Sequence, residues 1–319
     1  MSKRVALPEV LSILKNAQSL ILVSHVSPDG DTLGSTLALA EGLRQTGKKV
    51  TVMVDDDISS TYNFMPGIGE YIRPVKGQNY AADLLVIMDA SSLDRIGIVE
   101  ECVKAPILNI DHHISNTGFA DYLWLDDKAT ATGQMMFTLL KEMQVDITLA
   151  MAICLYVAIS TDCGNFKYSN TTAASMRAAA ELLELGVEPN VVSDFLEMKP
   201  RKNLELLRKV LNSLTFFNEG RISTIEINHE DYNKDVDTDN FISYPRYVEG
   251  VEVAVMFKAV ELNKTRVSMR SRWIDVSKIA LSFDGGGHMK ASGCTVEADL
   301  EEAKLQVVAK IQEEMRAKR

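Results

Sequence analysis

The sequence predicts an α/β protein with two domains joined by a helical linker. The first domain is expected to hold a mostly parallel sheet flanked by helices, because its most apolar segments alternate with helical patterns. The second, smaller α/β domain is expected to hold a mixed sheet, because its apolar residues recur at every second position, as on strands with one solvated face. The length of 319 residues suits two domains of about 150 residues each.

Short apolar segments bounded by polar turn residues mark the strands of the first domain. We predict these strands at residues 20–23, 49–54, 84–88 and 107–110. After the first strand, Thr32 is expected to cap a helix that Gly47 ends. Further helices are predicted at 129–143, 149–161 and 172–185, with a short one from Pro189. The first domain is therefore placed at residues 1–195.

The patterning changes in the last third of the chain. A charged helical pattern over residues 202–214 follows Pro200 and is interpreted as a connector, which places the linker at residues 196–215. The second domain then spans residues 216–319. Its predicted strands are 221–227, 251–260 and 265–272, and its predicted helices are 275–283 and 300–315.

The composition excludes several classes of partner. There are 34 Lys and Arg residues against 44 Asp and Glu residues, so the net charge of −10 argues against a broad basic face for long nucleic acid. No apolar run reaches the roughly 18–20 residues that span a bilayer, and Pro8, Glu9 and Lys15 interrupt any signal-peptide core. The four cysteines are scattered without a CxxC pair, as in reduced proteins. We therefore expect a cytoplasmic protein with no membrane partner.

Four of the five histidines lie in short clusters beside Asp or Gly. The first cluster places His25, Asp29 and Asp31 directly after the first predicted strand, at the sheet edge where open α/β sheets bind ligands. Asp31 alone would suit a helix cap, but the three residues together favour a site.

Two further clusters follow the next strands. Asp89 comes directly after a buried strand, where a carboxylate is costly unless it is hydrogen-bonded or bound to metal, although it could also cap the segment after it. Asp111, His112 and His113 end another strand, so one histidine could bind metal while Asp111 orients a histidine. The alternative for this cluster is a solvated polar turn.

Asp162 precedes a glycine at the end of an apolar helix, which is ordinarily a turn position, but it completes a ligand count. One ligand set would be His25, Asp29 and Asp89, and a second would be Asp31, Asp89, His112 and Asp162. Two ions roughly 3.5–4 Å apart are a known arrangement for phosphoester hydrolysis. Mixed imidazole and carboxylate ligands favour Mn²⁺, or alternatively Co²⁺, Fe²⁺ or Zn²⁺, over Mg²⁺.

The second domain carries a glycine cluster, Gly285 to Gly287, followed by His288. Successive glycines expose backbone N–H groups that suit a phosphate, and Arg270 on a nearby strand could add a guanidinium. The alternatives are a flexible turn for the glycines and a solvated strand face for the arginine. Together they favour a substrate-binding role.

These motifs resemble those of the DHH phosphoesterase superfamily across essentially the whole chain. The four N-terminal motifs match at His25-x-x-Pro28-Asp29-x-Asp31, Asp89, Asp111-His112-His113 and Asp162, and Gly285 to His288 resembles the signature of the DHH-associated C-terminal domain. The size of the chain resembles the stand-alone branch of nanoRNases and pAp phosphatases. This resemblance implies a two-lobed enzyme with a di-manganese centre in the cleft between its lobes.

The resemblance also implies residue roles. The implied metal ligands are His25, Asp29, Asp31, Asp89, His112 and Asp162. The implied catalytic residues are His113, which would contact the scissile phosphate, together with Asp111 and Asp89. The implied substrate-binding residues are Arg270, Ser271, Gly286, Gly287 and His288.

The implied reaction uses a hydroxide activated by two metal ions to hydrolyse short oligoribonucleotides (nanoRNA) to mononucleotides and 3′-phosphoadenosine 5′-phosphate (pAp) to AMP. A cyclic or linear dinucleotide phosphodiesterase, acting on c-di-AMP or pApA, is the nearest alternative, and an inorganic pyrophosphatase or exopolyphosphatase is a more distant one. A metal or nucleotide sensor without turnover is the alternative from another class. The sequence leaves a homodimer open.

Overall fold

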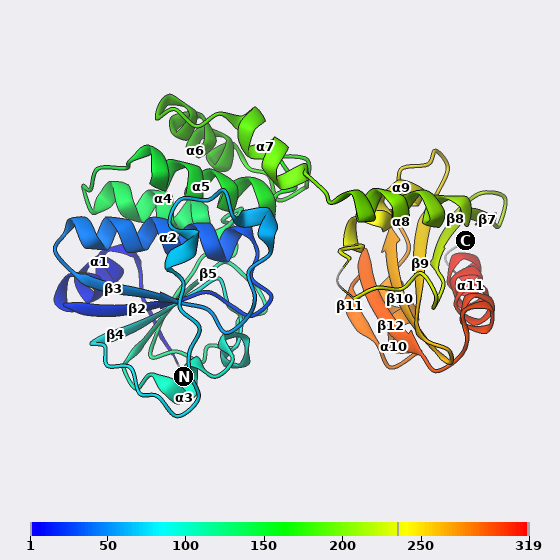
Figure 1. Cartoon of the computed structure of the whole chain (residues 1–319), viewed down its shortest axis with the longest axis horizontal. Helices are drawn as coiled ribbons and strands as arrows, with labels where there is room; N and C mark the ends of the chain where they lie inside the picture. The colour runs from blue at the N-terminus through cyan, green and yellow to red at the C-terminus, as the bar shows by residue number, and fades with distance from the viewer. Residues whose placement is uncertain (1, 235, 318–319) are drawn as a thin grey trace. The chain divides into compact units, whose positions relative to one another are not determined.

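The computed structural model describes residues 2–234 and 236–317, which form two compact units. The first unit extends to Met198 and the second begins at Lys199. Each unit contains one sheet of six strands with helices packed on it, which confirms the predicted α/β fold class (Figure 1).

The sheet of the first unit is entirely parallel in its registered pairs, in the order β1-β6-β5-β4-β2-β3. Its strands are β1 (Lys3–Arg4), β2 (Ser19–Val23), β3 (Lys49–Met53), β4 (Leu84–Met88), β5 (Ile107–Asp111) and β6 (Tyr122–Leu125). The four predicted strands are confirmed, whereas β1 and β6 were not predicted. The chain runs from β2 to β3 and returns to β4 on the other side of β2, so β2 and β4 border a topological switch point, where such sheets bind ligands.

Helices cover both faces of this sheet. They are α1 (Leu7–Asn16), α2 (Gly30–Gln45), α3 (Val99–Cys102), α4 (Thr132–Glu142), α5 (Leu149–Asp162), α6 (Ala173–Glu184) and α7 (Pro189–Glu197), with 3₁₀ turns η1 (Ser60–Tyr62), η2 (Ile68–Glu70) and η3 (Leu93–Ile96). Helices α1 and α2 share a core with one face of the sheet, and η3 and α3 share a core with the other. Helices α4 and α5 pack on α2 in a further layer (Figure 1).

Helix α2 is buried along most of its length because it lies between the sheet and α5. Small residues allow this close approach: a Cβ on Gly34 would lie 2.2 Å from the carbonyl oxygen of Cys154. The expected cap at Thr32 is wrong. Asp29 caps the helix instead, since its Oδ1 accepts the N–H groups of Asp31 and Thr32.

The second unit has a mixed sheet in the order β11-β12-β10-β9-β8-β7, in which only the pair β8–β9 is parallel among the registered pairs. Its strands are β7 (Thr215–Phe217), β8 (Ile222–Ile227), β9 (Val253–Glu261), β10 (Lys264–Ser271), β11 (Gly286–His288) and β12 (Ala291–Val296). Its helices are α8 (Arg201–Asn212), η4 (Asp239–Ile242), α9 (Ser243–Arg246), α10 (Val276–Leu281) and α11 (Leu300–Ala317).

The two faces of this sheet are covered unequally. Helices α10 and α11 form a core with one face, whereas α8 and α9 pack on the other face over β8 and β9. Helix α8, interpreted above as part of a linker, lies within the second unit, because Leu206, Leu207 and Val210 are buried against this face. On β10 and β12 the side chains that point to the α9 side are at least partly exposed, so this part of the face is open.

The described residues include no helix that is both long and apolar enough to cross a bilayer. The four cysteines are free thiols, as predicted from their spacing. All four are buried.

Candidate metal centre

The carboxyl ends of β2, β4 and β5 bring the Asp and His clusters together. His25 follows β2, Asp89 follows β4 directly, and Asp111 is the last residue of β5. The N–H group of Asp89 still donates to the carbonyl oxygen of Ile110 (2.9 Å), but its φ of 57° ends the strand there. Aspartate is one of the few residues other than glycine that adopts this left-handed conformation readily.

His25, Asp29 and Asp89 form the first potential ligand group. The Nε2 atom of His25 lies 3.8 Å from Oδ1 of Asp29 and 3.6 Å from Oδ2 of Asp89. The Nδ1 atom of His25 lies 2.8 Å from the carbonyl oxygen of Val26, which leaves Nε2 directed at the two carboxylates.

His112 stands at the centre of the second group. Its Nε2 atom lies 3.8 Å from Asp31, 3.4 Å from Asp89 and 3.8 Å from Asp162, measured to a carboxylate oxygen each time. This nitrogen is buried and has no hydrogen-bond partner among the described residues. Buried polar atoms rarely lack a partner, and ligands about 2.1 Å from one cation lie 3–4 Å apart. The donor set therefore fits a divalent ion.

Asp31 is fixed by the N-terminus of α4. It is fully buried and accepts N–H groups from Thr132 (2.7 Å) and Gly133 (2.8 Å), with a third hydrogen bond from Ser35 (3.1 Å). Thr132 also donates its hydroxyl to Asp89 (2.9 Å). The helix terminus thus holds two carboxylates in place before any ion arrives.

Asp111 contacts His113 and lies outside the first two groups. Its Oδ1 accepts from Nδ1 of His113 (2.7 Å), and its Oδ2 accepts from the side-chain amide of Asn116 (2.6 Å). Burial opposes ionisation, but the hydrogen bonds from His113 and Asn116 outweigh it and lower the pKa of Asp111. An ionised Asp111 holds the His113 ring in one tautomer and leaves Nε2 for another partner. His113 also lies near Asp89, at 3.6 Å from Nδ1 to Oδ1, and could join a third group with Asp89 and His112.

The charges at this sheet edge favour cations. Burial raises the pKa of Asp31, with the charges of Asp89 and Asp162 adding to it. Burial also raises the pKa of Asp162 to about 6. Burial alone would lower the pKa of His25, but its hydrogen bonds with Asp29 and Asp89 prevail and raise it to about 9. Bound divalent ions would compensate the clustered carboxylates.

The sequence did not reveal several supporting residues. Thr132 and Gly133 lie about a hundred positions from Asp31, and Asn116 carries no pattern of its own. Arg95 has an NH2 group 2.9 Å from Nδ1 of His25, and its carbonyl oxygen accepts the N–H of Val26 (2.7 Å). Of these residues only Gly133 could have been singled out from the sequence, because it is a glycine. The structure explains that glycine, since a Cβ at Gly133 would lie 2.4 Å from the Cβ of Ala158.

In the second unit, Arg270 and His288 share one row of the sheet. Arg270 on β10 and His288 on β11 both pair with Ala291 of β12, so their side chains stand on the same face with only a methyl group between them. Two strand spacings separate them by about 10 Å, a gap that an Arg and a His can bracket around a phosphate.

Gly286 and Gly287 are part of the edge strand β11, which pairs with β12, so a flexible turn does not describe these two glycines; Gly285 precedes the strand. Gly287 is required by space, because a Cβ there would lie 2.6 Å from the carbonyl oxygen of Ala291, and its φ is 133°. Gly286 has open space around it.

The expected role of Ser271 in substrate binding does not agree with the structure. Ser271 is only 2 % exposed, and its hydroxyl oxygen accepts the N–H groups of Trp273 (3.2 Å) and Ile274 (2.7 Å). It points to the face opposite Arg270, because neighbouring strand residues alternate.

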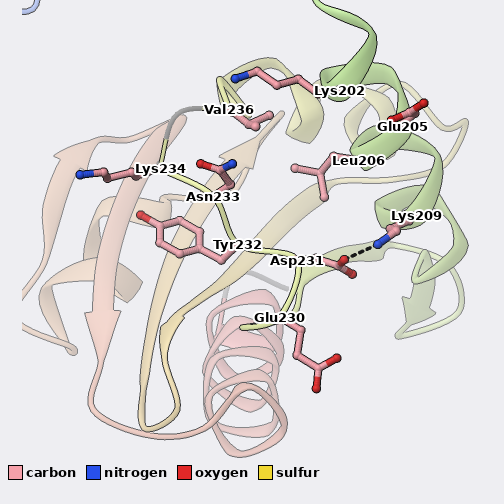
Figure 2. Close-up of a pocket in the computed structure, with 10 residues that line it drawn as sticks. All are labelled: Lys202, Glu205, Leu206, Lys209, Glu230, Asp231, Tyr232, Asn233, Lys234 and Val236. Atoms are coloured by element: carbon pink, nitrogen blue, oxygen red, sulfur yellow. Dashed lines mark hydrogen bonds and ion pairs between the residues drawn. The ribbon is translucent and has the colours of Figure 1, made fainter.

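Figure 2 shows a separate hollow of about 680 Å³ in the second unit, between α8 and the segment after β8. Lys209 is paired there with Asp231, while Lys202, Lys234 and Glu230 point in different directions. Its mixed charges do not converge on a single ligand, and it contains none of the predicted site residues.

Comparisons with known proteins agree with the two units. Residues 19–159 match the family described as "DHH family, N-terminal domain", and residues 222–317 match the "DHHA1 domain". The chain is 34% identical over 309 residues to "Bifunctional oligoribonuclease and PAP phosphatase NrnA" of Thermus thermophilus, covering 96% of this chain and 93% of that protein. It is 26% identical to the protein of that name from Bacillus subtilis, covering 95% of this chain and 98% of that protein.

A solved structure has the same fold. It is described as an "exopolyphosphatase-related protein" from Bacteroides fragilis, with a TM-score of 0.86 and 25% identity over 95% of this chain and 94% of that one. The fold, the Asp and His clusters and the named relatives all indicate the same family, and the relatives match nearly the whole chain. The chain therefore belongs to the DHH family, whose members are phosphoester hydrolases that use divalent metal ions, and its second unit is a DHHA1 domain.

Proposed function

We propose that this protein hydrolyses short oligoribonucleotides to mononucleotides and pAp to AMP, with Mn²⁺ as its metal. The relatives named as oligoribonucleases and PAP phosphatases support the substrates. The observation that carries the metal-dependent chemistry is the buried, unpartnered Nε2 of His112 among three carboxylates. Mixed nitrogen and oxygen donors support Mn²⁺ over Mg²⁺.

The proposed ligand sets share Asp89. His25, Asp29 and Asp89 would hold one ion. Asp31, Asp89, His112 and Asp162 would hold the other. When bound, a pair of divalent ions supplies an acidified water and neutralises phosphate charge.

His113 and Asp111 act on the substrate side of this centre in the proposal. His113 contacts the scissile phosphate and stabilises the developing charge or protonates the leaving oxygen. Asp111 keeps the His113 ring oriented through the 2.7 Å hydrogen bond to Nδ1, so that Nε2 meets the substrate. The exposure of His113, whose side chain is 44% accessible, suits contact with a ligand.

The DHHA1 domain binds the remaining phosphate in the proposal. Arg270 and His288 bracket the anion from one row of the sheet, and of the successive N–H groups of Gly286 and Gly287 on the edge strand β11 one points outward, toward a ligand. Ser271 is left out of the proposal because its side chain is buried on the other face.

A hydrolysis panel tests this function. The purified protein would be incubated with Mn²⁺ and RNAs of two to ten nucleotides, pAp, c-di-AMP, pApA and pyrophosphate. Release of mononucleotides and AMP from short RNA and pAp is expected. Turnover of c-di-AMP alone, or of pyrophosphate alone, would overturn the substrate assignment and leave the metal centre in place. No turnover by folded, Mn²⁺-loaded protein would favour a sensor.

A further inference from the structure

Exposed aromatic side chains gather at one border of the open face in the DHHA1 domain. Tyr244 is 50% exposed, Tyr247 is 67% exposed and Trp273 is 66% exposed. Large aromatic side chains are costly to expose, so such a group on one surface indicates a binding role. With Arg246 and Arg272 we call these residues the aromatic border.

Hydrogen bonds connect the two segments that carry the border. Tyr244 and Arg246 lie on α9, and Tyr247 follows it directly. Arg272 follows β10, and its guanidinium donates to the carbonyl oxygen of Arg246 (3.4 Å). Trp273 is next in the chain, in the turn that the Ser271 hydroxyl holds.

The border adjoins the row that carries Arg270 and His288. Ala254 of β9 pairs with Arg270 and is buried on the face that α9 covers, so Arg270 is the first residue of its row beyond α9. Arg270 therefore lies between the exposed aromatic groups and His288.

The border carries two guanidinium groups despite the acidic net charge of the chain. Arg246 lies over the Tyr247 ring, 6.0 Å from its centroid, and Arg272 is anchored beside it. Of the nearby acids, Glu252 is occupied by a two-pronged ion pair with Arg221 (2.8 and 3.1 Å), and Asp275 caps α10 through the N–H of Ser277. Glu249 lies two residues after Tyr247. Aromatic planes interleaved with guanidinium groups match unpaired bases joined by phosphates.

We propose that the aromatic border stacks the bases of single-stranded oligoribonucleotides beyond the nucleotide held at the row of Arg270 and His288. This inference rests on the proposed function and extends it to substrate length. A nucleotide bisphosphate has a single nucleoside, so once it is held at this row it has no further base to offer the border. The border therefore favours RNA of three or more nucleotides over pAp.

Tryptophan fluorescence of the full-length protein tests this binding directly. The chain has two tryptophans, so the Trp124→Phe variant leaves Trp273 as the only emitter. In EDTA, which prevents metal-dependent turnover, a five-nucleotide RNA is expected to quench Trp273 with saturation, and pAp is expected to leave it unchanged. Unchanged emission with the RNA would overturn the proposal.

Matched variants separate stacking from general effects. Tyr247→Ala and Trp273→Ala are expected to weaken binding of a labelled five-nucleotide RNA by about tenfold each, in line with the loss of one base stack. Leu305→Ala is the control, since Leu305 is 69% exposed on α11, which packs on the other face of the same sheet. Equal weakening by the control, or no weakening by either border variant, would contradict the proposal.

Two further outcomes are distinguishable. If the mass in solution doubles with concentration and Trp273→Ala alone abolishes this, the border is a self-association surface and the proposal is wrong. If the wild-type protein binds the RNA through Trp273 but hydrolyses neither RNA nor pAp, the proposed function fails while the border remains an RNA-binding surface.

Discussion

The two units present polar side chains in opposite ways. In the first unit, Asp89 and Asp111 are buried at the ends of parallel strands and Asp31 in the first turn of α2, and backbone or side-chain donors hold each of them. In the DHHA1 domain, Arg270 is half-buried and His288 is exposed, both on an open face of a mixed sheet.

This difference follows from what each site must do. Ligands for a divalent ion need fixed positions and low solvent access, which buried strand ends supply. Recognition of a flexible chain of phosphates and bases needs accessible donors and aromatic planes, which a one-sided sheet supplies. Variants in the first unit should therefore lower kcat, whereas variants on the open face should raise KM.

The largest effect is expected from Asp89→Asn, which keeps the size of the side chain and removes the charge shared by both ligand sets. We expect kcat for pAp to fall by at least about 10³-fold, since metal-ion catalysis supplies several kcal/mol at about 1.4 kcal/mol per tenfold. Asp94→Asn is the control, because Asp94 is an exposed aspartate nearby. Retention of a tenth of the activity by Asp89→Asn would contradict the shared role.

His113→Gln should lower kcat by about 10²-fold, the low end for a lost general acid. Asp111→Asn should lower it by about tenfold, because the ring loses its orienting partner. Manganese content by elemental analysis should match the wild type in both variants. Loss of metal from His113→Gln would instead make His113 a ligand, which would require its Nδ1, 3.6 Å from Asp89, to give up the hydrogen bond to Asp111.

Metal binding should stabilise the first unit. At a Mn²⁺ concentration of about 100 times Kd, the free energy of unfolding should rise by about 2.7 kcal/mol over EDTA-treated protein. Thermal unfolding with and without Mn²⁺ measures this increase. Asp31→Asn should remove it, and Arg270→Ala should keep it; a metal-dependent shift lost in Arg270→Ala would break the contrast between the units.

The smallest effect is expected on the open face. Arg270→Ala should raise KM for pAp by about tenfold with little change in kcat, because one charge-assisted contact to a remote phosphate is lost. Arg266→Ala is the matched control, four residues earlier on the same strand and the same face. An equal rise in KM for both variants would assign the effect to the general positive potential of the face.

The local pattern was sufficient for the strands and helices with strong periodicity. The apolar strands β2, β4 and β5 and the helices α4 to α6 were predicted within a few residues of their observed bounds. The short strand β1, and β11 with its glycines, were missed because their sequences lack an apolar pattern and depend on pairing with distant strands.

The sequence by itself determined the α/β class, the Asp and His clusters and their position after parallel strands, because side-chain type and strand order are local or topological properties. Only the tertiary structure decided which donors hold the carboxylates and which side chains reach the open face of the second sheet. Asp31 meets Thr132 and Gly133 across a hundred residues, Ser271 turns away from Arg270, and α9 brings Tyr247 to the open face. These contacts depend on register and helix packing between distant segments, which no local pattern encodes.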